Sequence, residues 1–225
     1  MPPSLIFLIF VVVSLALGLG LPTVMHFSVK IRASNKSFFC SFIYAHNNHI
    51  LRRTLWDSLA AHKHVVKVAP WIVLGDFNVA LDMEDSTAGA YGISRGMDDF
   101  RDCVNRIEME DLNFKGLFYT WTKSPNGFGG ILKKIDRVLG NPCFVASFPS
   151  ASITFLPYRS SDHSPTVLSL PLRSCSSLNP PLRKLLRFQG NIFTKVISLR
   201  TELDRVQIAL DQDPFNRDLR DKQCR

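Results

Sequence analysis

Three short segments place polar side chains that could carry out acid–base or metal chemistry where the surrounding pattern predicts a core. Asp76 and Asn78 end the apolar run in WIVLGDFN, and Asp136 lies among apolar residues in KKIDRVLGN. In SSDHSP, Asp162 directly precedes His163. Hydrolysis of a phosphodiester needs a positioned base, stabilisation of developing negative charge and usually a divalent cation. Carboxylates, an amide and an imidazole can supply these functions together.

The placement of Asp76 and Asn78 is informative by itself. WIVLG is a short apolar run typical of a strand buried on both faces, and the two polar residues follow at its carboxyl end. Open α/β sheets bind ligands at that end, and a period of two places both side chains on the same side. A structural interpretation also exists, because an aspartate after a strand often forms a turn. The three segments together, in this order, are far more specific than any one alone.

The rest of the chain predicts an α/β domain that would position these side chains. Strands are expected at residues 24–32, 38–45, 71–75, 118–122, 131–139, 152–156 and 166–170. A helix with Leu51, Leu55 and Leu59 on one face is expected after the second strand, and Ser94 can cap another helix. The glycine-rich segment SPNGFGG is typical of a hairpin loop between two strands.

In this order, the three segments resemble the later motifs of the endonuclease/exonuclease/phosphatase superfamily, which includes DNase-I-like nucleases. Three further segments resemble plant non-LTR (LINE-type) retrotransposons: FIYAHNNHILRRTLWDSL, FYTWTKSPNG with GILKKIDRVLGN, and ELDRVQIALDQDPFNRDLR. The resemblance covers residues 24–172 and again 188–222. It implies an α/β fold, a partial four-layer sandwich of the DNase-I-like type that is truncated at its amino-terminal side.

The resemblance also implies roles for the polar residues. Asp76 would orient or deprotonate the attacking water, and Asn78 would hold a phosphate oxygen. His163 would contact the scissile phosphate, with Asp136 fixing its protonation and orientation. These four residues are therefore the predicted catalytic set.

The same resemblance places Asp162 at or beside a metal, while Tyr44 and Asn47 match positions that contact the phosphate. Clustered oxygen ligands suit Mg²⁺ or Mn²⁺ better than zinc. The family also has a metal-binding glutamate upstream of the tyrosine strand, but residues 1–75 of this chain contain Asp57 as their one acidic residue. We therefore expect impaired metal binding and weak or absent nuclease activity.

Several functions remain open on the sequence. The leading hypothesis is a divalent-metal-dependent endonuclease acting on DNA, nuclear or cytoplasmic like its family. The alternatives are a non-catalytic nucleic-acid-binding remnant and a membrane-tethered interaction module. A net charge of +8 favours a polyanionic partner over a small phosphorylated substrate, although a solvated basic surface would give the same charge. The five cysteines form no C-x-x-C pair, so neither a zinc site nor a disulfide framework is predicted.

Residues 4–21 form one uncharged run at the lower length limit for crossing a bilayer. A membrane anchor, a cleaved signal and a foreign start all remain possible. No basic residue precedes the run, whereas Lys30 and Arg32 follow it, which for an anchor would leave the rest of the chain cytosolic. We expect the run to form a helix that packs poorly on the domain.

The chain divides into a hydrophobic segment (residues 1–22), the domain (23–172), a linker (173–190) and a helical tail (191–225). In the tail, six apolar residues alternate at spacings of four and three: Ile192, Val196, Leu199, Leu203, Val206 and Leu210. Such a helix usually packs on its own domain, with a coiled-coil partner as the alternative. We expect a continuous helix set apart from the site.

Overall fold

The computed structural model describes residues 4–8, 23–31, 34–88, 94–123, 130–157, 161–171 and 192–223. Its strands are β1 (Ser4–Leu8), β2 (Thr23–Ile31), β3 (Lys36–Tyr44), β4 (Trp71–Asp76), β5 (Glu110–Asp111), β6 (Phe114–Gly116), β7 (Trp121–Lys123), β8 (Ile131–Lys133), β9 (Asp136–Gly140), β10 (Ser152–Phe155) and β11 (Thr166–Pro171). Its helices are α2 (His49–Val66), α3 (Arg95–Arg106), α4 (Pro142–Ser147), α5 (Ile192–Gln212), α6 (Arg217–Gln223) and the short 3₁₀ helix η1 (Met83–Asp85).

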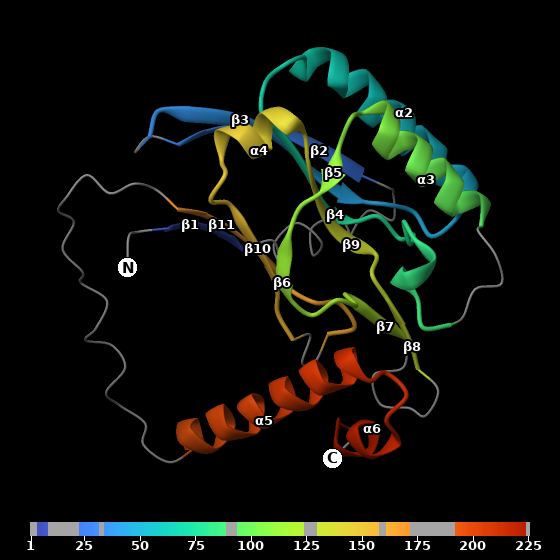
Figure 1. The fold of residues 1–225 in the computed structure, drawn as a ribbon, viewed down its shortest axis with the longest axis vertical. Coiled ribbons are helices and arrows are strands. Elements are labelled where there is room, and N and C mark those ends of the chain that lie inside the picture. Colours follow the sequence, from blue (N-terminus) through green and yellow to red (C-terminus); the bar gives the residue numbers. More distant parts are fainter. Residues whose placement is uncertain are drawn as a thin grey trace.

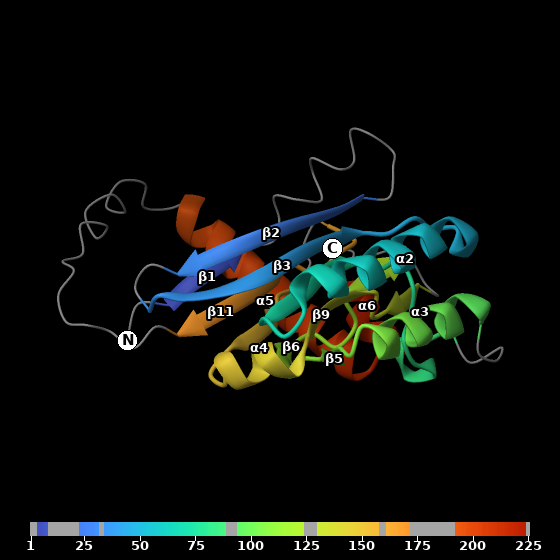
Figure 2. The same cartoon turned by 90° about the horizontal axis from the view of Figure 1, so that it is seen from above.

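Two sheets form the centre of the domain, and the predicted α/β class is confirmed. The larger sheet has the strand order β2-β3-β4-β9-β5, and the smaller has the order β1-β11-β10-β6. Strands β7 and β8 form a separate hairpin. In Figure 1, α2 and α3 lie on one side of the larger sheet and the smaller sheet lies on the other. Figure 2 shows the two helices side by side.

Two apolar cores hold these layers together. Trp56, Phe77 and Phe100 stack between the helices and the larger sheet, with ring centroids 4.9–6.4 Å apart. A second core lies between the sheets, where Leu74 of β4 and Phe155 of β10 are both fully buried. Both faces of the larger sheet and the inner face of the smaller sheet are thus covered by an apolar layer.

The apolar amino-terminal run does not begin as a helix. Ser4–Leu8 is a strand that pairs antiparallel with β11, from Ser4 opposite Pro171 to Leu8 opposite Val167. The helix expectation is therefore wrong for these five residues. An uninterrupted apolar run has no helical period, and the open edge of β11 offers unpaired backbone groups that a strand can satisfy. Residues 9–22 lie outside the described part of the chain.

No helix among the described residues is long and apolar enough to cross a membrane.

Two predicted strands have different bounds in the structure. Phe118 lies between β6 and β7 rather than in a strand, and the strand predicted at residues 131–139 is divided into β8 and β9. The division occurs where the hydroxyl of Thr120 accepts hydrogen bonds from the backbone N–H groups of Ile135 and Asp136, at 3.1 and 2.9 Å. The contact with Thr120 therefore marks the point where the chain leaves the hairpin and enters the larger sheet.

The helices agree with the sequence more closely. Ser94 caps α3 by accepting a hydrogen bond from the backbone N–H of Met97. In α2 the buried face carries Leu55 and Leu59 as expected, whereas Leu51 is exposed. The tail contains the predicted continuous helix, α5. The linker at residues 173–190 and the SPNGFGG loop apart from its last residue lie outside the described residues.

Candidate active site

A glycine sets the position of the first candidate residue. Gly75 has a φ of +134°, and a Cβ at this position would lie 2.1 Å from the carbonyl oxygen of Ile43 on β3. No other residue fits so close a strand approach. The next residue, Asp76, lies opposite Tyr44 on β3 and Asp136 on β9. Three side chains from separate parts of the sequence are thereby placed across neighbouring strands.

Asp76 is held by the residue two positions later. Asp76 is only 2% exposed. Its two carboxylate oxygens accept hydrogen bonds from the backbone N–H and the Nδ2 of Asn78, at 2.8 and 2.9 Å. Asn78 has a φ of +52° and also donates from Nδ2 to the carbonyl oxygen of Ala45. This left-handed conformation folds the amide back onto the carboxylate.

Burial and a neighbouring carboxylate perturb Asp76. Burial, followed by the negative charge of Asp136, raises the pKa of Asp76 from 3.8 to about 7. The charge of His163, the N–H of Asn78 and the charge of Arg52 lower the pKa and offset part of this increase. A carboxyl that changes protonation near neutral pH is suited to general base catalysis.

Asp136 and His163 form the second part of the site. Nδ1 of His163 lies 3.0 Å from Oδ2 of Asp136. Burial lowers the pKa of His163, but the hydrogen bond and charge of Asp136, and the charges of Asp76 and Asp162, outweigh it and raise the pKa to about 9. With Nδ1 facing Asp136, Nε2 is the ring nitrogen left to contact a ligand.

The β7–β8 hairpin fixes the loop that carries His163. The backbone N–H of Ser164 donates to the carbonyl oxygen of Thr120 at 2.7 Å, and Trp121 forms an isolated β-bridge with His163. Nε1 of Trp121 also donates to Oδ2 of Asp162 at 3.3 Å. The loop therefore depends on the hairpin for its position.

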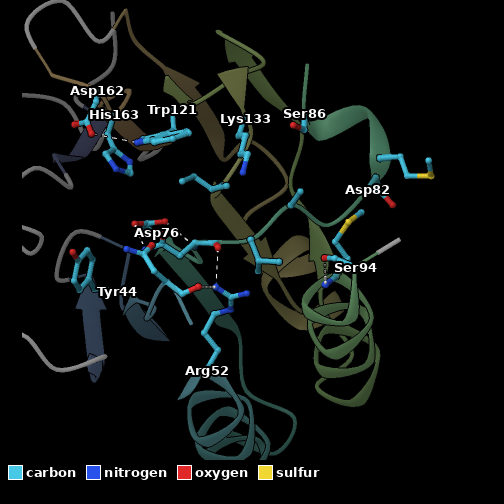
Figure 3. Close-up of a pocket in the computed structure, with 17 residues that line it drawn as sticks. Tyr44, Arg52, Asp76, Asp82, Ser86, Ser94, Trp121, Lys133, Asp162 and His163 are labelled. Carbon is cyan, nitrogen blue, oxygen red and sulfur yellow. Dashed lines mark hydrogen bonds between the residues drawn. The ribbon is translucent and has the colours of Figure 1, made fainter. Parts of the chain in front are cut away.

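These side chains surround one cavity of about 670 Å³. In Figure 3, His163, Trp121 and Lys133 lie above the cavity, and Asp76 and Arg52 lie below it. Six of the seven predicted site residues line it: Tyr44, Asn47, Asp76, Asn78, Asp162 and His163. The seventh, Asp136, lies behind His163 and is bonded to it. The structure thus brings the predicted residues together.

Arg52 is a site residue that the sequence prediction missed. It lines the cavity but is buried, and its Nη1 donates to the carbonyl oxygens of His46, Asn47 and Asn78 at 2.9, 3.1 and 2.9 Å. Arg52 therefore joins the loop after β3 to the loop after β4. The signal was present in the sequence, because position 52 lies three residues before Leu55 and so shares its helix face.

The acidic residues of the site fit a divalent cation. Asp76, Asp136 and His163 each present one ligand atom, and these atoms lie within 4.8 Å of one another. Asp162, the predicted metal residue, is not in this group but lines the same cavity. Two buried carboxylates side by side repel each other, and a bound cation would relieve that repulsion.

Comparisons with known proteins identify the family and the fold of the chain. The model of the Endonuclease/Exonuclease/phosphatase family matches residues 9–163. The endonuclease domain of TRAS1, a telomere-specific non-LTR retrotransposon, has a similar structure with a TM-score of 0.51 at 13% identity, covering 68% of this chain and 70% of that domain. This likeness supports the predicted partial sandwich.

Two bacterial structures are also similar. The 3′ phosphatase NExo from Neisseria, bound to a product DNA hairpin, has a TM-score of 0.47 at 17% identity and covers 64% of this chain and 63% of that one. The endonuclease/exonuclease/phosphatase from Bacteroides vulgatus has a TM-score of 0.46 at 19% identity and covers 67% and 56%. Among curated proteins no sequence matches this chain.

Proposed function

Because the chain belongs to the endonuclease/exonuclease/phosphatase family, we propose that it is a phosphodiester hydrolase of the endonuclease type that acts on DNA. The observation that carries the proposal is the arrangement of Asp76, Asn78, Asp136 and His163 at one cavity. A base oriented by an amide and an imidazole oriented by a carboxylate supply the proton acceptor and the charge stabilisation that phosphodiester hydrolysis needs.

Residues on the two faces of the cavity have different roles in the proposed reaction. Asp76, whose oxygens are oriented by Asn78, positions a water molecule and accepts its proton. His163, oriented by Asp136, contacts a non-bridging oxygen of the phosphate through Nε2. Tyr44 lies on the same cavity and contacts the phosphate from the opposite face. Both hydrogens of the Asn78 Nδ2 are donated within the protein, to Asp76 and to Ala45, so Asn78 acts by orienting Asp76.

Asp76 and Asp136 would hold a divalent cation such as Mg²⁺ or Mn²⁺, because their carboxylates and the ring of His163 lie within 4.8 Å of one another, and Asp162 lines the same cavity. When bound, the cation would stabilise negative charge on the phosphate oxygens. Two carboxylates are few protein ligands for Mg²⁺, which gives up its bound water reluctantly. We therefore expect weak metal binding and low activity.

A retrotransposon origin is part of the proposal. It rests on the resemblance of the tyrosine strand, the hairpin and the tail to plant non-LTR elements, and the TRAS1 endonuclease domain offers the same fold. The net charge of +8 is in keeping with a nucleic-acid partner.

The test is nicking of supercoiled plasmid by the purified chain in Mg²⁺ and in Mn²⁺. His163→Ala and Asp76→Asn should abolish nicking, whereas the matched exposed variants His64→Ala and Asp102→Asn should retain it. Nicking that survives both site substitutions would reject the proposal. Absence of nicking with salt-sensitive DNA binding would favour a non-catalytic remnant instead.

A further inference from the structure

The carboxy-terminal tail lies outside the residues that match the family model, yet it contacts the domain. Helices α5 and α6 follow residue 163, where that match ends. Figure 1 shows them beside the β7–β8 hairpin. Val206, Gln207 and Leu210 on α5 are buried. The sequence predicts a tail set apart from the site, and indeed no α5 or α6 residue lines the described cavity. The tail nevertheless contacts the β7–β8 hairpin, and through the hairpin it is connected to the site.

Asp211, near the end of α5, binds the backbone that enters the hairpin. One of its carboxylate oxygens accepts from the N–H of Phe118 and the other from the N–H of Tyr119, both at 2.7 Å. A carboxylate that receives two backbone donors makes stronger hydrogen bonds than a neutral acceptor. The segment immediately before β7 is thus held by the tail.

Arg220 on α6 binds the other strand of the same hairpin. Its Nη2 donates to the carbonyl oxygen of Gly130 at 3.1 Å, directly before β8 begins. Arg220 is itself fixed by donating from Nε to the carbonyl oxygen of Pro214 at 2.9 Å. The tail therefore contacts the hairpin at two points, in the segment before β7 and at the loop end of β8.

The segment bound by Asp211 leads directly to the backbone that holds the proposed catalytic residues. Tyr119 is followed by Thr120, whose hydroxyl accepts from the backbone N–H of Asp136 and whose carbonyl oxygen accepts from the N–H of Ser164. The next residue, Trp121, bridges His163. The Asp211 contact at Tyr119 is therefore one residue away from Thr120, which holds the backbone beside both members of the Asp136–His163 pair.

We propose that Asp211 and Arg220 are positioning residues for this site, and that the tail orders the Asp136–His163 pair through the β7–β8 hairpin. The functional part of this inference rests on the proposed function, whereas the mechanical part does not. A tail that merely adds stability would protect all parts of the fold equally. A positioning tail acts on the hairpin and on the loop that carries His163.

The experiment uses the full chain with Asp211→Ala, Asp211→Asn and, as a matched control, Gln212→Ala at the exposed neighbouring position. Backbone hydrogen exchange is measured by NMR. In Asp211→Ala, the amides of Thr122 and Ser164 should exchange roughly tenfold faster or more, because a charge-assisted contact behind them is lost. Sheet amides such as that of Leu139 should keep their wild-type rates, as should all amides in the control.

Asp211→Asn keeps one carbonyl oxygen as an acceptor, so its exchange rates should fall between those of the wild type and Asp211→Ala. Unchanged exchange at Thr122 and Ser164, or an equal increase at Leu139, would overturn the proposal. The same variants are assayed for nicking, where kcat should fall while KM stays near the wild-type value. If the wild type does not nick, the proposed function fails, and the exchange rates still decide whether the tail orders the site.

Discussion

Replacing Asp76 with asparagine should stabilise the protein while removing the proposed catalytic base. Asp76 is buried beside the carboxylate of Asp136, and burial followed by that charge raises its pKa from 3.8 to about 7. The folded state therefore binds the proton more tightly than the unfolded state. The contribution of Asp76 to stability is complete below pH 4 and is lost as the pH rises through 7.

The size of the effect follows from the two pKa values. The difference between 3.8 and about 7 corresponds to about 4 kcal/mol at about 1.4 kcal/mol per pKa unit. Asparagine carries no charge, but its amide has one oxygen where the carboxylate has two. The Nδ2 of Asn78 therefore loses its acceptor at position 76, which costs about 1 kcal/mol. Above pH 7 a net gain of about 3 kcal/mol remains, which for a chain of this size raises the Tm by roughly 6–12 °C.

The assay is thermal and urea unfolding of the wild type and Asp76→Asn at pH 4 and pH 8 in EDTA, with Asp102→Asn as the exposed control. The Asp76→Asn variant should be the more stable protein at pH 8 and lose this advantage at pH 4. Addition of Mn²⁺ at pH 8 should narrow the gap, because a cation that binds ionised Asp76 stabilises only the wild type. Equal or lower stability of Asp76→Asn at pH 8 would refute the reasoning from burial and like charge.

Three further substitutions or deletions test the packing around the site. Gly75→Ala should destabilise the fold by roughly 2–5 kcal/mol in urea unfolding, since its Cβ would meet the carbonyl of Ile43 at a positive φ. Arg137→Met should cost about 3–5 kcal/mol because it leaves the buried carboxylate of Asp85 without its partner, and adding Asp85→Asn should recover part of that loss. Deleting residues 192–223 should lower the Tm of an otherwise cooperative transition, because two buried apolar side chains are lost.

The motifs of the candidate site could be predicted because their signals are local. A buried strand that ends in Gly75 and Asp76 is visible in the sequence, and β-strand pairing then places Asp136 opposite Asp76. The adjacency of Asp162 and His163 is likewise a sequence fact. Only the convergence of these segments required the fold, and the family resemblance supplied it.

Other features depend on tertiary contacts that leave little trace in the sequence. The division between β8 and β9 follows from the hydroxyl of Thr120, which resembles any other strand threonine. Arg52 shares a helix face with Leu55, but its link between two loops depends on three carbonyl acceptors that only the fold brings together. The run at Ser4–Leu8 has no hydrophobic period that distinguishes a strand from a helix. Its strand conformation follows from pairing with the edge of β11.

Three unfavourable features of this fold lie together at the candidate site. The glycine-only backbone of Gly75, the left-handed φ of Asn78 and the buried pair of Asp76 and Asp136 all fall at the carboxyl end of β4. Such strain persists where surrounding contacts over-determine it, and it clusters at functional sites. Arg52 supplies that support here through its bond to the carbonyl oxygen of Asn78. A stabilising Asp76→Asn substitution would therefore show that the fold still carries the energetic cost of a catalytic arrangement, even where the plasmid assay finds little turnover.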